Sequence, residues 1–142
     1  MKILVSACLL GIPCRYDGKS IAVPQVCELE ARHQLIPICP EQLGGLPTPR
    51  PPSERQGDRV VNREGLDVTD HFKRGAECAV AIARLSGADL ALLKQNSPSC
   101  GCGSRYDGTF TGTLTKENGL TTEYLLKAGI PVISEKDINM KF

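Results

Sequence analysis

Short apolar runs alternate along this chain with longer stretches in which apolar residues recur at helical spacing. The apolar runs are bounded by Gly, Pro or polar residues, as buried strands usually are. They cover residues 2–6, 35–38, 90–93 and 130–134, and the helical stretches cover 24–34, 71–85 and 120–128. Strands that alternate with helices predict a parallel sheet with right-handed crossovers. We therefore expect a single α/β domain over residues 1–142, a small three-layer Rossmann-like fold with a mainly parallel sheet of about four strands and flanking helices.

The two longer helical stretches have recognisable boundaries. Thr69 or Asp70 is expected to cap the helix over residues 71–85, and Gly87 is expected to end it. The earlier helix is expected to begin at Pro24, a residue suited to a first turn, and to run to Gln34. The apolar positions expected to face the sheet are Phe72, Ala76, Ala79, Val80 and Ala83 in one helix, and Val23, Val26, Cys27 and Ala31 in the other.

Three connecting segments complete the prediction. Residues 46–57 contain four prolines and are expected to be irregular, because proline fixes φ and lacks an N–H donor. A long loop of this kind in a small domain is usually functional or mobile. Residues 59–62 are expected to form a short strand, and residues 105–115 an edge hairpin. No G-x-G-x-x-G sequence follows the first strand, so the fingerprint of a dinucleotide site is missing.

Composition and charge narrow the class of protein. Hydrophobic residues make up 41% and charged residues 23% of the 142 residues, and the net charge is +1. This balance gives no overall footprint for nucleic acid or membranes, and no apolar run is long enough to span a bilayer. The apolar stretch at the start of the chain is too short and too interrupted for a secretory signal, so we expect a cytoplasmic protein. The cytoplasm keeps thiols reduced, which favours metal binding or catalysis over disulfides for the loop cysteines among the seven present.

Three cysteines occupy equivalent places in the predicted topology. Cys8, Cys39 and Cys100 each follow an expected core strand and precede a loop that contains Gly or Pro. Ligands of open α/β sheets bind outside the carboxyl ends of the strands, so three thiols at such ends can meet in one site. Cys27 and Cys78 lie in expected helices and are predicted to be packing residues.

The type and number of these ligands bear on which metal they would hold. Thiolates select zinc, copper(I) or iron–sulfur clusters. A closed zinc site needs four ligands, commonly in C-x₂₋₄-C pairs, and only Cys100 and Cys102 approach that spacing. Three thiolates fit better a cubane cluster with one open iron, which can bind a sulfur atom as a Lewis acid. Cys14 and Cys102 are spare thiols that could replace a ligand, accept sulfur or simply pack.

Polar residues beside these cysteines are candidates for proton transfer and substrate binding. Glu41 follows Cys39 by two residues and could shuttle protons, although a loop glutamate is more often a solvated charge. Ser97 and Ser99 precede Cys100, where they could relay a proton or form the turn. Lys94 ends a core strand and could neutralise an anion or extend into solvent.

A four-residue string occurs twice in the chain. Residues 15–18 and 105–108 both read Arg-Tyr-Asp-Gly, and each copy follows one of the three cysteines by a few residues. The two copies could be similar β-turns, or two arms that frame one pocket. The second interpretation makes Tyr16, Asp17 and Tyr106 candidate substrate-binding residues.

Taken together, three motifs resemble the bacterial thiouracil desulfurase family over essentially the whole chain. They are VSACLLG with RYDG (residues 5–11 and 15–18), CPEQLGGLPTPR (39–50), and LK, SPSCG and YDGTF (93–94, 97–101 and 106–110). The resemblance implies a [4Fe-4S] enzyme that converts a thiolated uracil such as 2-thiouracil to uracil and hydrosulfide without net redox chemistry. It implies Cys8, Cys39 and Cys100 as cluster ligands, Glu41 as the acidic residue, and Ser97 or Ser99 as the serine.

The resemblance also implies partners. Some relatives carry a second domain and act on thiouridine in tRNA. We expect no such domain in these 142 residues, which favours a small thiolated nucleobase over thiouridine-containing RNA as the substrate. The iron–sulfur assembly machinery would supply the cluster, and no membrane partner is expected. Two other functions stay open on the residues alone: a non-catalytic zinc-binding module and a thiol-based sulfur carrier or redox protein.

Overall fold

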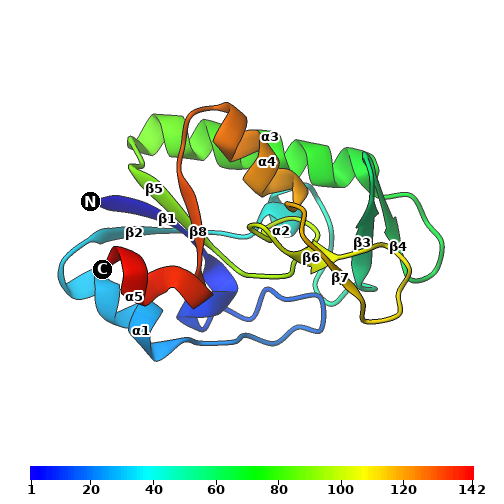
Figure 1. Ribbon diagram of the computed structural model, residues 1–142, viewed down its shortest axis with the longest axis horizontal. Coiled ribbons are helices and arrows are strands. Elements are labelled where there is room, and N and C mark those ends of the chain that lie inside the picture. Colours follow the sequence, from blue (N-terminus) through cyan, green and yellow to red (C-terminus); the bar gives the residue numbers. More distant parts are fainter.

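A computed structural model describes residues 1–142, except for the side chain of Met140. Its largest sheet has four strands in the order β2-β1-β5-β8, and every neighbouring pair is parallel (Figure 1). These strands are β1 (Lys2–Ser6), β2 (Gln34–Ile38), β5 (Leu90–Leu93) and β8 (Val132–Ser134). The α/β class and the mainly parallel four-stranded sheet are thus confirmed.

Helices cover both faces of this sheet. The long α3 and the shorter α4 lie on one face, and α1 and α5 lie on the other (Figure 1). The helices are α1 (Pro24–Cys27), α2 (Pro40–Leu43), α3 (Thr69–Ser86), α4 (Leu120–Lys127) and α5 (Ile138–Lys141), with 3₁₀ turns η1 (Ala7–Leu10), η2 (Glu28–Ala31) and η3 (Glu135–Asp137). None of the helices in the described part of the chain combines the length and apolar content needed to cross a bilayer.

Alternate residues of the central strands enter two different cores. Ile3 and Val5 of β1 pack with the first helix, whereas Leu4 packs with α3 and α4. All three side chains are fully buried. A strand that is covered on both faces reads as a continuous apolar run, and this is the pattern by which the sequence indicated the strands.

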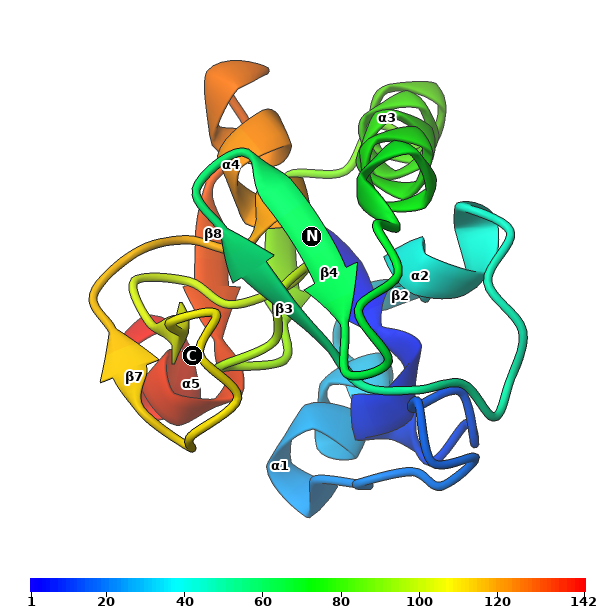
Figure 2. The same ribbon diagram turned by 90° about the vertical axis from the view of Figure 1, so that its right-hand side faces the viewer.

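Two small antiparallel hairpins lie beyond the main sheet. One pairs β3 (Ser53–Gln56) with β4 (Arg59–Asn62), and the other pairs β6 (Arg105–Tyr106) with β7 (Leu114–Thr115). Figure 2 looks onto the β3–β4 hairpin, which lies in front of the sheet. Under it, Val60 of β4 packs against Phe72 of α3 in a third apolar cluster.

Three expectations about local structure were wrong in part. The irregular segment over residues 46–57 ends in strand β3, because its prolines stop at Pro52 and the following residues pair with β4. The hairpin in residues 105–115 forms its own sheet and extends no edge of the main one. The helix expected over residues 24–34 gives way to a 3₁₀ turn at Glu28, and Gln34 instead begins β2 beside β1.

The change from α-helix to 3₁₀ turn alters which side chains face inward. Val26 is buried as expected, but Ala31 is exposed, because the spacing of the turn no longer carries it to the sheet. At the long helix the expected cap is also wrong: Val68 is the N-cap residue, and Thr69 is the first helical residue. The Thr69 hydroxyl instead accepts the backbone N–H of Val60 at 2.9 Å. Gly87 ends the helix in the left-handed conformation, as expected.

Candidate active site

A cavity of about 530 Å³ opens at the carboxyl ends of β1, β2 and β5. Here the chain leaves β1 toward β2 on one side, and β5 lies on the other side. Such a reversal of strand order leaves a crevice that binds ligands in open α/β folds. The size is within the range of small-molecule sites.

Four cysteines line the cavity, including all three that follow strands. Cys8 follows β1, Cys39 follows β2, Cys100 follows the loop after β5, and Cys14 joins them from the loop after η1. Cys102 is not among the lining residues, and its thiol instead donates a hydrogen bond to the Val132 carbonyl at 3.4 Å. The tertiary structure thus separates the two spare thiols, which the sequence treated alike.

Crowding and burial oppose ionisation of these thiols. The adjacent Cys14 thiol and burial together raise the pKa of Cys39 above its ordinary value. Burial is the largest cause that raises the pKa of Cys100, to about 12. For Cys14, the interaction with Cys39 lowers the pKa, but the proximity of Cys8 and burial outweigh it, and the net shift is upward. A cationic metal centre would reverse this preference, because thiolates are the metal-binding form.

The donor set fits a cluster better than a single ion. Within the described residues, no three His, Cys, Asp or Glu side chains are grouped closely enough to hold one metal ion. A [4Fe-4S] cubane has irons at four of its eight corners and sulfides at the other four, so its cysteine ligands bind separate irons and need not converge on one atom. Cys8, Cys39 and Cys100 come from three different strand ends around one cavity, and this arrangement fits such a group.

Glu41 is a cavity residue with a fixed partner. Its Oε1 accepts a hydrogen bond from Arg50 Nε at 2.9 Å, and both side chains are largely buried. The same guanidinium donates to the Cys14 carbonyl at 3.0 Å and to the Thr48 hydroxyl at 2.9 Å. Arg50 therefore ties the Pro-rich segment to both the cysteine loop and the carboxylate.

Two glycines set the position of α2, the short helix that carries Glu41. Gly44 and Gly75 lie where α2 and α3 touch, and both are buried. A Cβ atom on Gly75 would overlap the Pro40 carbonyl, and one on Gly44 would overlap the His71 carbonyl. This close approach holds Cys39 and Glu41 against the body of the domain.

The two candidate serines face different surroundings. Ser97 lines the cavity, and its Oγ accepts the backbone N–H groups of Ser99 at 3.1 Å and Cys100 at 3.0 Å. Ser99 is 1% exposed and lies outside the cavity lining, where its hydroxyl bonds to Thr121 at 2.7 Å. The structure thus brings Ser97 to the site and turns Ser99 toward α4.

Lys94 also lines the cavity, but its side chain is anchored. Its Nζ donates to the Gln95 carbonyl at 2.9 Å and lies 3.6 Å from Glu135 Oε1. Its backbone N–H donates to Ser6 Oγ at 2.9 Å, which joins the ends of β1 and β5. Ser6 is a buried cavity residue inside the VSACLLG motif that was not singled out as a candidate site residue.

The repeated Arg-Tyr-Asp-Gly segments form two arms at this cavity, with different anchoring. Tyr16 and Tyr106 both line the cavity and are about two-fifths exposed, whereas Asp17 does not line it and accepts the Lys19 N–H at 3.0 Å. Arg15 is partly exposed and lies 3.7 Å from Asp17.

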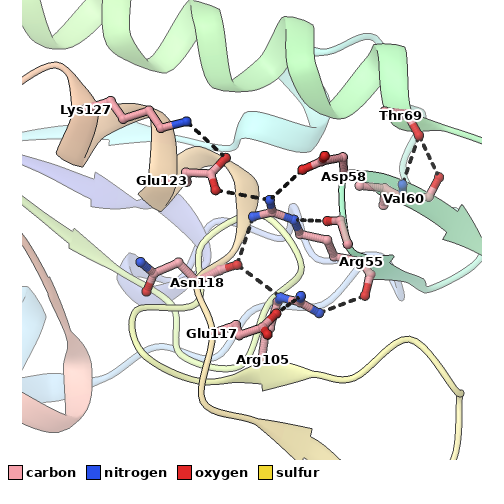
Figure 3. Close-up of polar contacts among 10 residues, drawn as sticks. Arg55, Asp58, Val60, Thr69, Arg105, Glu117, Asn118, Glu123 and Lys127 are labelled. Atoms are coloured by element: carbon pink, nitrogen blue, oxygen red, sulfur yellow. Dashed lines mark hydrogen bonds and ion pairs between the residues drawn. The ribbon is translucent and has the colours of Figure 1, made fainter.

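In the second arm, the arginine is buried in a polar network. Arg105 is 3% exposed, and its guanidinium donates to the carbonyls of Arg55 at 2.7 Å and Asn118 at 3.1 Å and pairs with Glu117 (Figure 3). Arg55 in turn bonds to Asn118 and to Glu123 of α4. This network connects the second arm to the β3–β4 hairpin and to α4.

Several cavity residues were not singled out from the sequence. Arg50 and Phe110 lie inside the family motifs, and the Pro-rich character of residues 46–57 signalled a functional loop. Glu54 lies in that same segment but was not singled out, because the strand that carries it was expected to be irregular. Only the hairpin pairing brings Glu54 to the cavity wall.

Nearly the whole chain is similar to known proteins. The family model described as 2-thiouracil desulfurase matches residues 3–137. The uncharacterized protein YbbK of Bacillus subtilis (strain 168) is 41% identical over 147 residues, which is 96% of this chain and 97% of YbbK. The solved structure of TudS, a [4Fe-4S]-dependent thiouracil desulfidase, is 50% identical with a TM-score of 0.93 and covers 98% of this chain and 93% of its own. The match therefore extends over the residues that form both the sheet and the cavity of this chain.

Proposed function

Because this chain belongs to the 2-thiouracil desulfurase family, we propose that it is an iron–sulfur-dependent enzyme that hydrolyses the C–S bond of a thiolated uracil. Thiouracil and one water would give uracil and hydrogen sulfide, which leaves as hydrosulfide and a proton, with no net oxidation or reduction. The observation that carries the proposal is the cavity in which Cys8, Cys39 and Cys100 lie beside Glu41.

Cys8, Cys39 and Cys100 would hold a [4Fe-4S] cluster through their thiolates. This ligand assignment is supported by the equivalent places of the three cysteines after β1, β2 and β5, and by the cluster dependence of the solved relative. When bound, a cluster with three protein ligands supplies a Lewis-acidic iron toward a soft sulfur atom. Cys14 would remain a fourth thiol at the wall. The cell's iron–sulfur assembly machinery would supply the cluster.

Glu41 would act as the base. The carboxylate is held at 2.9 Å by Arg50 and borders the cavity, so it can take a proton from a water molecule placed against the thiocarbonyl carbon. The ion pair limits the rotation of the carboxylate, which keeps the proton acceptor in one orientation. Ser97 is the serine with access to the cavity, and its hydroxyl hydrogen is available to a substrate atom while its oxygen caps the turn before Cys100.

The other residues of the cavity wall would bind the nucleobase. Tyr16 and Tyr106 bring aromatic rings from the two arms, and Lys94 offers a cation at the end of β5. Asp17 would contribute only by shaping the first arm, because its carboxylate bonds within that arm. A cavity of about 530 Å³ suits a small thiolated nucleobase better than a folded RNA.

An anaerobic assay tests this function directly. Protein reconstituted with iron and sulfide should be brown, contain both elements in equal amounts, and release uracil and hydrosulfide from 2-thiouracil or 4-thiouracil. Thiouridine and thiouridine-containing RNA serve as alternative substrates in the same assay. A colourless protein with one zinc per chain would contradict the proposal, as would a metal-free protein with a reactive thiol.

A further inference from the structure

One oxygen of the Glu54 carboxylate accepts hydrogen bonds from the protein backbone, and the other accepts none within the described residues. Glu54 is 7% exposed on β3, and its Oε1 accepts the backbone N–H groups of Gly108 at 3.0 Å and Phe110 at 3.1 Å. Oε2 makes no hydrogen bond within the described residues. No fully buried side-chain oxygen or nitrogen in that part of the chain lacks a partner. Oε2 therefore borders open space, and Glu54 lines the cavity.

The loop that Oε1 holds presents an aromatic ring to the same cavity. Phe110 lines it with a half-buried side chain, and its φ of 58° is in the left-handed region that aromatic residues rarely adopt. Such a conformation persists when the surroundings hold it in place, and the bond from Phe110 N–H to Glu54 does so here. The Arg63 guanidinium lies 5.8 Å from the centre of the ring and supports it.

These two residues match the chemistry of a pyrimidine base. A thiolated uracil is flat and carries ring N–H groups next to its carbonyl and thiocarbonyl carbons. A flat ring packs favourably on an aromatic side chain, and an ionised carboxylate is a strong acceptor for an N–H donor. Neither the proposed cluster ligands nor Glu41 has a role in binding the ring N–H groups or the flat face of the substrate.

We propose that Glu54 and Phe110 form the base-recognition element of the cavity, an inference that rests on the proposed function. Glu54 Oε2 accepts a ring N–H, and Phe110 packs against the face of the ring. Glu54 is at the same time a positioning residue, because its other oxygen fixes the backbone that directs Phe110 inward. The proposed substrate class is thus a thiolated pyrimidine that carries a hydrogen on at least one of its ring nitrogens, next to the thiocarbonyl or the carbonyl carbon.

The substitution Glu54→Gln separates the two roles of the carboxylate. The amide oxygen can still accept from Gly108 and Phe110, which leaves the NH₂ group toward the cavity, where it opposes a ring N–H. Binding of uracil, 1-methyluracil and 3-methyluracil to the cluster-loaded enzyme is measured by anaerobic calorimetry. We expect one methyl isomer to bind wild type at least about tenfold more weakly than uracil. Glu54→Gln should weaken uracil binding by a similar factor and abolish the penalty for that methyl group.

The decisive result is that the effects of Glu54→Gln and of ring methylation on the binding free energy do not add. A merely structural defect would weaken the binding of all three ligands equally. Glu64→Gln, an exposed acid after β4, is the matched control and should bind uracil like wild type. Phe110→Leu and Phe110→Ala should raise KM for 2-thiouracil progressively while kcat stays within about twofold. The proposal is overturned if wild type binds both methyl isomers as tightly as uracil, or if Glu54→Gln leaves the methyl penalty intact. Failure of the proposed function is seen separately, as a wild type with an intact cluster that releases no hydrosulfide.

Discussion

Arg50 Nε lies 2.9 Å from Glu41 Oε1, and this ion pair joins the Pro-rich segment to the residue two positions after Cys39. Arg50 is 8% exposed, and its other hydrogen bonds reach the carbonyls of Cys14 and Pro47 and the hydroxyl of Thr48. One guanidinium thus connects three segments at the cavity, namely the loop that contains Cys14, helix α2 and the Pro-rich segment itself. The consequence is that the conformation of the Pro-rich segment and the orientation of the proposed base depend on the same side chain.

Arg50→Met should therefore affect stability and turnover together. Removing one partner of a buried pair leaves the other charge uncompensated, and we expect a loss of about 3 kcal/mol in the free energy of unfolding. Denaturant unfolding measures this loss. Arg50→Lys restores the charge but not the fork of donors, so it should recover only part of the stability. Equal stability of Arg50→Met and wild type would contradict the role given to this pair.

Single alanine substitutions of the cysteines should divide them into two groups. Cys8→Ala, Cys39→Ala and Cys100→Ala should each lose iron content, visible absorbance and activity together, because each removes a proposed cluster ligand. Cys102→Ala and Cys27→Ala should retain all three, since those thiols bond to backbone carbonyls outside the cavity. Iron and sulfide analysis after anaerobic reconstitution distinguishes the groups.

Cys14→Ala tests the ligand assignment most severely. With three ligands from strand ends, this variant should still bind a full cluster. A complete loss of iron from Cys14→Ala, with iron retained in one of the other three variants, would show that Cys14 replaces that ligand.

Glu41→Ala should keep the cluster and lose turnover. Its carboxylate is the proposed proton acceptor, and general-base catalysis typically contributes at least about 100-fold to rate. Rates of uracil formation at matched iron content measure the effect. Glu41→Gln keeps the size of the side chain and should be equally inactive, which separates the missing base from a local collapse. Normal turnover in either variant would exclude Glu41 as the base.

The two serines should differ in what their loss affects. Ser97→Ala removes a hydroxyl from the cavity and should lower kcat by about 100-fold. Ser99→Ala removes a buried hydrogen bond with Thr121 and should cost about 1 kcal/mol of stability with turnover preserved. Thermal unfolding and steady-state assays are run in parallel on both variants. Loss of turnover in Ser99→Ala with normal turnover in Ser97→Ala would contradict this assignment.

Gly75→Ala should disturb the site from outside it. The added Cβ would overlap the Pro40 carbonyl, so α2 and α3 must separate and carry Cys39 and Glu41 with them. Overpacking of this kind costs about 1–3 kcal/mol. Ala76 is the neighbouring buried position, and Ala76→Gly is a control that weakens the helix without forcing α2 away. Lower stability with unchanged kcat in Gly75→Ala would show that the contact does not position the site.

The sequence by itself determined the α/β class, the alternation of strands and helices along the chain, and the residues at the strand ends. Apolar runs such as 90–93 are unambiguous because strands buried on both faces need continuous apolar residues. Cys8, Cys39 and Cys100 followed from the same pattern, since the carboxyl ends of parallel strands meet at one edge. Glu41 was a candidate from its place two residues after Cys39, and the resemblance to the family implied its role as the acidic residue.

Only the tertiary structure decided which nearby residues reach the cavity. Ser97 and Ser99 are two residues apart, yet one faces the cavity and the other α4; Cys14 and Cys102 are divided in the same way. Arg50 and Glu54 gained their roles from partners distant in sequence, the Cys14 carbonyl in one case and the loop at Gly108 and Phe110 in the other. Local periodicity reports whether a side chain is buried against its own sheet. The direction of a loop side chain is set by long-range contacts that leave no periodic trace in the chain.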